Sequence, residues 1–129
     1  MDEKIGWGLF LGRLVLGVIM VAHGCQKLGH MEDAVQLFHR MGQPAWLAYV
    51  TAIIETGGGL LLVVGLFVVP AAMLLGLTMI GAIVLVHLPQ GLIGGFEFPL
   101  ALLGISMILA MTGSDKLSLA EIFKNRKET

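Results

Sequence analysis

Apolar residues along this chain gather into four long runs separated by short polar segments. Each run approaches the roughly 20 apolar residues with which an α-helix crosses the hydrocarbon core of a bilayer. We therefore expect four membrane-spanning helices. Their approximate bounds are residues 5–24, 46–68, 71–88 and 96–112.

Proline and glycine mark the connections between these runs. Gly42-Gln-Pro44 precedes the second run, Pro70 lies at the start of the third, and Pro89 follows it. Such residues typically end a helix or begin a new one, and connections this short place consecutive helices antiparallel. The pattern predicts an all-α fold, an integral membrane four-helix up-down bundle that forms a single domain over residues 1–129.

The connection between the first and second runs contains an amphipathic segment. Its apolar residues recur at i, i+3, i+4 and i+7, which is the spacing of one helix face. This spacing predicts a short amphipathic loop helix over residues 31–41, ended by Gly42. The four apolar residues are Ala34, Leu37, Phe38 and Met41.

The segment after the fourth run is also amphipathic. Ser118 is followed three residues later by Glu121, a pattern typical of a helix N-terminal cap. Leu119, Ile122 and Phe123 then share one face, beside a basic cluster. We expect residues 114–129 to form an amphipathic C-terminal tail on the inner membrane surface.

Composition strengthens the membrane interpretation. Apolar side chains make up 57% of the 129 residues and charged ones only 13%, and the mean hydropathy is +0.90. A soluble domain of this size is rarely so apolar. Met-Asp-Glu-Lys, a poor basic leader, precedes the first run, and the run contains Arg13, so we interpret it as a span rather than a cleaved signal peptide.

The charge distribution bears on partners and orientation. A net charge of −1 offers no basic surface for nucleic acid, which we exclude as a partner. Basic residues outside the spans are concentrated at the two ends of the chain, so the positive-inside rule predicts an inner (cytoplasmic) membrane protein with both termini cytoplasmic. The single cysteine, Cys25, excludes an intramolecular disulfide and a C-x-x-C redox pair.

Two opposite charges lie inside the predicted spans. Arg13 is expected about 12 Å from the inner end of the first span, and Glu55 about 15 Å from the inner end of the second. A charge near the bilayer centre costs at least about 2.5–3.5 kcal/mol, so each needs a partner. We therefore predict an Arg13–Glu55 ion pair, which either fixes the packing of the bundle or forms the floor of a site.

The other polar side chains of the spans gather near their outer ends and could line one polar pocket. Imidazole, ammonium and carboxylate groups there could bind a polar headgroup, relay protons or hold a metal, and two histidines could ligate haem. No spacing of a known metal site is present, so no metal site is assigned. The simplest alternative is a set of interfacial residues. The group consists of His23, Gln26, Lys27, His87 and Glu97.

The order of these features resembles the DoxX family over nearly the whole chain. Its most specific element is Glu55 with Gly58-Gly59, downstream of the arginine and the lysine of the first span. One departure is Ala120 after Leu119, where the family often has an acidic residue. The matching residues are Arg13, His23-Gly24, Lys27-Leu28, Phe38, Gly42-Gln-Pro44, Glu55, Gly58-Gly59, Gly65-Leu66, His87, Glu97, Gly113 and Leu117-Ser118-Leu119.

The resemblance implies a small four-helix membrane protein. Some relatives are associated with quinone-linked oxidation of sulfur compounds, and others with membrane complexes that handle oxidative stress. We therefore predict a membrane subunit of a quinone-linked oxidoreductase system, without a covalent cofactor of its own, that binds a quinone or similar amphiphile. In this hypothesis His87 and Glu97 exchange protons, and the ligand-binding residues are Arg13, Glu55, His23 and Lys27.

Two other functions fit the same sequence. The chain could be a non-catalytic subunit that recruits a soluble partner through its loop helix or tail, or a small-solute carrier component that requires a homo-oligomer. The sequence contains no nucleotide loop, nucleophile elbow or dense metal site, so whether the chain itself is an enzyme stays open at this point. In each case the bilayer and a protein partner or second copy are its expected surroundings.

Overall fold

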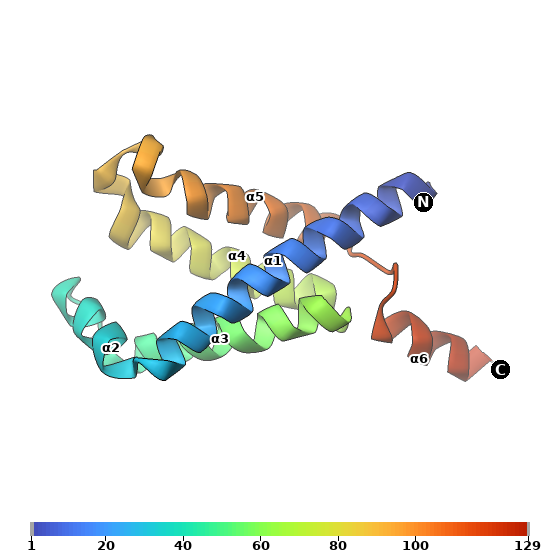
Figure 1. Cartoon of the computed structure of the whole chain (residues 1–129), viewed down its shortest axis with the longest axis horizontal. Helices are drawn as coiled ribbons and strands as arrows, with labels where there is room; N and C mark the ends of the chain where they lie inside the picture. Colours follow the sequence, from blue (N-terminus) through green and yellow to red (C-terminus); the bar gives the residue numbers. More distant parts are fainter. Residues whose placement is uncertain (1, 129) are drawn as a thin grey trace.

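Helices and tight helical turns account for every regular element of the computed structural model, which describes residues 2–128 (Figure 1). No strand occurs among these residues. The elements are α1 (Glu3–Gly29), α2 (Met31–Arg40), α3 (Ala45–Val64), α4 (Val68–Ala82), η1 (Ile83–His87), η2 (Leu88–Gln90), η3 (Leu92–Phe96), α5 (Glu97–Thr112) and α6 (Leu119–Glu128).

Four helical segments are long and apolar enough to cross a bilayer. They have mean hydropathies of 1.8 to 2.4 over their best windows. The chain is therefore a multi-pass membrane protein with an all-α fold, as the apolar runs predict. The segments are Glu3–Gly29, Ala45–Val64, Val68–Gln90 and Leu92–Thr112.

Two helix ends differ from the sequence-based bounds. The first helix continues to Gly29, five residues past the predicted end at 24. The second ends at Val64 rather than 68, because Gly65 adopts a left-handed conformation (φ 76°) and its N–H donates to the Leu61 carbonyl. A left-handed glycine is a common helix terminator, and it overrides the continuing apolar run.

The closest pairings of long helices are α1 with α3 and α4 with α5, and α4 also packs against α3. Where α1 crosses α3, the backbones touch through glycine: a Cβ on Gly17 would lie 2.8 Å from the Gly59 carbonyl oxygen. Small residues allow such close approach between membrane helices. The buried core between the pairs includes Leu16, Met20, Leu62, Leu75 and Leu109.

Helix α2 and the η2–η3 turn lie at one end of the bundle, and the N-terminus and α6 lie at the other (Figure 1). The predicted amphipathic loop helix is confirmed as α2, which buries Ala34 and Phe38 against Ala48 of α3. The predicted tail cap is also present, because the Glu121 N–H donates to Ser118 Oγ at 3.1 Å. Helix α2 therefore covers the end of the bundle at which the polar site is expected.

Candidate functional site

Arg13 does not pair with Glu55, so the predicted ion pair is wrong. The guanidinium is fully buried and donates to the backbone carbonyl oxygens of Ser114, at 3.2 Å, and Leu117, at 3.0 Å. It also stacks over the Phe10 ring, 5.1 Å from the centroid. Arg13 therefore ties α1 to the segment between α5 and α6.

The reason is the register between α1 and α3. Arg13 lies level with Gly65, where a Cβ would come within 2.9 Å of Arg13 Nη1. Glu55 lies ten residues before Gly65, about 15 Å along the helix. The depth estimate failed because it set the inner ends of the two helices at the same level, whereas the part of α1 before Arg13 extends past the end of α3.

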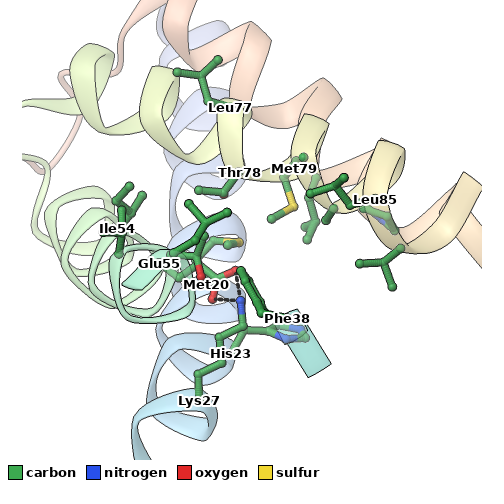
Figure 2. Close-up of a pocket in the computed structure, with 18 of the residues that line it drawn as sticks. Met20, His23, Lys27, Phe38, Ile54, Glu55, Leu77, Thr78, Met79 and Leu85 are labelled. Carbon is green, nitrogen blue, oxygen red and sulfur yellow. Dashed lines mark hydrogen bonds and ion pairs between the residues drawn. The ribbon is translucent and has the colours of Figure 1, made fainter. Parts of the chain in front are cut away.

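Glu55 instead pairs with Lys27. The Lys27 Nζ atom lies 2.9 Å from Glu55 Oε1 and 2.8 Å from Oε2, so the ammonium contacts both carboxylate oxygens (Figure 2). The Glu55 side chain is 6% exposed and that of Lys27 is 28% exposed. The pair neutralises a buried carboxylate, which would otherwise be strongly destabilising.

A cavity of about 480 Å³ opens beside this ion pair. Its walls come from α1, α2, α3, the α4–η1 segment and α5, and they are mainly apolar. Figure 2 shows Lys27 and Glu55 on one side of it and Leu77, Thr78, Met79 and Leu85 on the other. The polar side chains that line the cavity are His23, Lys27, Thr51, Glu55, Thr78 and His87.

Two histidines contribute to the cavity from different helices. His87 ends η1, and its Nδ1 atom is buried with no hydrogen-bond partner among the described residues. The His23 ring lies 5.8 Å from the ring of Phe98, measured between centroids. His87 lines the cavity, but its Nδ1 atom is not itself exposed there, so a bound molecule reaches this atom only if the ring turns.

The polar group expected from the sequence is only partly assembled. His23, Lys27 and His87 line the cavity, whereas Gln26 and Glu97 do not. Glu97 is exposed, and its Oε1 accepts a hydrogen bond from the Gly94 N–H at 2.9 Å. Since Gly94 has a left-handed backbone (φ 75°), Glu97 stabilises the turn before α5.

Sequence analysis missed Thr51 and Thr78, as well as the cover that Phe38 of α2 provides. The sequence gives little indication that the threonines belong to a site, because each hydroxyl donates to the carbonyl three residues earlier in its own helix, as threonines in membrane helices often do. The Lys27–Glu55 pair did leave a signal. Lys27 falls on the same helix stripe as Gly17 and Gly24, the face that packs on α3.

The arrangement suits a neutral or weakly polar headgroup attached to an apolar body. Convergent donors and acceptors at one side of an apolar cavity are typical of small-molecule sites. Over residues 2–128, no three His, Cys, Asp or Glu side chains gather as a metal site would require. Fold and cavity together define a multi-pass helical membrane protein with a ligand-sized cavity inside its bundle.

Comparison with known proteins places this architecture in a family. The DoxX family model matches residues 8–88. A Bacillus subtilis (strain 168) protein named "Putative oxidoreductase CatD" is 40% identical over 128 residues, which cover 98% of this chain and 96% of that protein. The chain belongs to the DoxX family. No solved structure matches it significantly.

Proposed function

We propose that this protein is a membrane component of an oxidoreductase system and that it binds a quinone, or a similar amphiphile, in the cavity beside Lys27 and Glu55. The observation that carries the proposal is the mainly apolar cavity of about 480 Å³ with an ion pair and the His87 imidazole among the groups that line it. The oxidoreductase class is supported by the printed name of the Bacillus subtilis relative.

The cavity's polar atoms match both redox forms of a quinone headgroup. The Lys27 ammonium can donate a hydrogen bond to a quinone carbonyl, and the Glu55 carboxylate can accept one from a quinol hydroxyl. The His87 imidazole, which lines the cavity, can serve either form, because its ring tautomer is adjustable. The apolar walls then hold the ring and the beginning of the tail.

Proton exchange is assigned to Glu55, Lys27 and His87 in this proposal. All three line the cavity, whereas Glu97 lies outside it. A group that exchanges protons with a ligand must lie within hydrogen-bond reach of it, directly or through one water. Reducing equivalents come from an electron-donating partner of the oxidoreductase system.

The test is a titration of the purified protein in lipid nanodiscs with a short-tailed quinone, followed by calorimetry. Wild type should bind saturably. His87→Leu keeps the wall apolar but removes one hydrogen-bond partner, so its Kd should rise about two- to tenfold. Glu97→Gln is the matched control and should bind like wild type, because Glu97 does not line the cavity.

Two results would contradict the proposal. One is a folded wild-type protein without saturable binding, which would favour the recruiting subunit and direct attention to α2 and α6. The other is equal weakening by His87→Leu and Glu97→Gln, which would move the ligand from the cavity to the η2–η3 turn.

A further inference from the structure

We propose that the ligand enters the cavity sideways from the bilayer, between α3 and α4, and that its apolar tail lies along the α4 wall past Gly81. The inference deepens the proposed function and rests on it for the nature of the headgroup. It assigns the substrate class as amphiphiles with a long apolar chain. Water-soluble molecules that have only the headgroup are excluded as preferred ligands.

The first support is that cavity-lining residues of α3 and α4 are also well exposed. Leu77 is 64% exposed and Val50 is 38% exposed, although both line the cavity. In a multi-pass protein, exposed apolar side chains at this depth face lipid acyl chains. On this side the cavity is therefore lined by exposed apolar residues, which acyl chains can contact.

The second support is depth. Leu77 is nine residues from the start of the third span, Val68–Gln90, and thus about 14 Å along it. The hydrocarbon core is about 30 Å thick, so Leu77 lies near its middle. An opening at this level meets acyl chains and not water, so the molecules that reach it are those dissolved in the membrane.

The third support is the free space on the α4 wall. Gly81 lines the cavity, and a Cβ at this position would meet no atom within 4 Å outside its own helix. The neighbouring lining residue is the small Ala82. Together these two small residues leave space on the α4 wall one helical turn from Leu77, which a linear chain can occupy.

The polar groups of the cavity are also positioned to contact the headgroup of such a ligand. Lys27 and Glu55 face the α4 residues across the cavity (Figure 2). Phe38 of α2 lines the cavity as well and is buried against α3. A molecule that enters past Leu77 therefore meets the ion pair with its headgroup and keeps its tail in the opening.

The test compares two quinones with the same ring, one without a tail and one with a two-isoprenyl tail, in nanodiscs and with concentrations expressed per lipid. Gly81→Leu fills the space on the α4 wall, so it should weaken the tailed quinone by about tenfold and change the tail-less one less than about twofold. The matched control is Gly104→Leu on α5. A Cβ at Gly104 also meets nothing within 4 Å, but Gly104 does not line this cavity. It should change neither.

Equal weakening of both quinones by Gly81→Leu, or no weakening of either, would overturn the inference. A second measurement separates it from the proposed function. A fatty acid with a photoreactive diazirine in its chain should label cavity residues in wild type and Gly104→Leu, but not in Gly81→Leu.

If neither quinone binds while this labelling pattern is found, the quinone assignment fails and lateral access for a chain-bearing amphiphile stands. If the cavity is never labelled, even in wild type, lateral access fails whichever headgroup the site prefers.

Discussion

Lys27 determines whether the carboxylate of Glu55 can remain inside the bundle. Its ammonium contacts both carboxylate oxygens, at 2.8 and 2.9 Å, and Glu55 is only 6% exposed. The pair thus combines a structural role with a position on the cavity wall. The effect of Lys27 on protein stability can therefore be measured separately from its effect on ligand binding.

We expect Lys27→Met to destabilise the protein by about 1–3 kcal/mol, because it leaves a buried carboxylate without its partner. Adding Glu55→Gln should recover part of that loss, since the amide carries no charge. Reversible unfolding in mixed detergent micelles measures both effects. A Lys27→Met protein as stable as wild type would show that water, and not Lys27, satisfies Glu55.

Arg13 has a separate role at the opposite end of the bundle. Its guanidinium donates to carbonyl oxygens of Ser114 and Leu117, and the Ala120 N–H donates to the Gly65 carbonyl at 3.2 Å. These bonds attach the segment before α6 to the interior of α1, and the start of α6 to the end of α3. Arg13 therefore stabilises the packing of these segments, and it does not line the cavity.

For Arg13→Met, we expect a loss of about 2–4 kcal/mol, because two hydrogen bonds from a charged donor disappear and the carbonyls remain buried. Hydrogen exchange should accelerate most in residues 113–120, and quinone binding by the folded fraction should be unchanged. If exchange accelerated around Glu55 instead, the result would support the Arg13–Glu55 ion pair that the structure contradicts.

At the scale of elements, the α1–α3 crossing holds the ion pair in register. Gly59 is packed so closely that an added Cβ would lie 2.8 Å from the Gly17 carbonyl oxygen. The same contact seen from Gly17 is equally short. Neither helix can rotate or move apart without also separating Lys27 from Glu55.

Gly59→Ala should therefore destabilise the bundle by about 1–3 kcal/mol, the usual cost of forcing extra atoms into a packed contact. Gly57→Ala is a matched control on the same helix, because a Cβ there meets nothing within 4 Å. It should be neutral or slightly stabilising, since alanine favours helix. Equal effects of the two substitutions would contradict the close crossing.

Apolar periodicity predicted the helices but not how they meet. Four spans, α2 and the Ser118 cap follow from local patterns. The partners of Arg13 and Glu55 depend on the register of α1 against α3, which places Arg13 at the level of Gly65 and not of Glu55. The cavity was predicted only through His23, Lys27, Glu55 and His87, because its apolar walls use residues that any membrane helix contains.

At the scale of the whole molecule, the N-terminal end of α1 and α6 lie at the same end of the bundle, and α2 lies at the other (Figure 1). The basic residues at the two chain ends predict that this shared end is cytoplasmic. The exposed Cys25, near the end of α1 beside α2, then faces the outer side. Chemical labelling of its thiol therefore tests the orientation of the protein in the membrane.

In intact cells, a membrane-impermeant maleimide should label wild-type protein at Cys25. A Cys25→Ser, Lys124→Cys variant should react only after the cells are permeabilised, because Lys124 belongs to α6 at the end that is predicted to be cytoplasmic. The reverse pattern would invert the predicted orientation and would place the cavity's polar end toward the cytoplasm.

The central claim is that an amphiphile binds inside the bundle beside the Lys27–Glu55 pair, and the most direct measurement is photolabelling with an azidoquinone followed by mass spectrometry of the peptides. The account predicts adducts on the cavity walls of α1, α3 and α4, suppressed by excess unlabelled quinone. Adducts confined to the η2–η3 turn or α6, or spread over lipid-facing residues without competition, would contradict it.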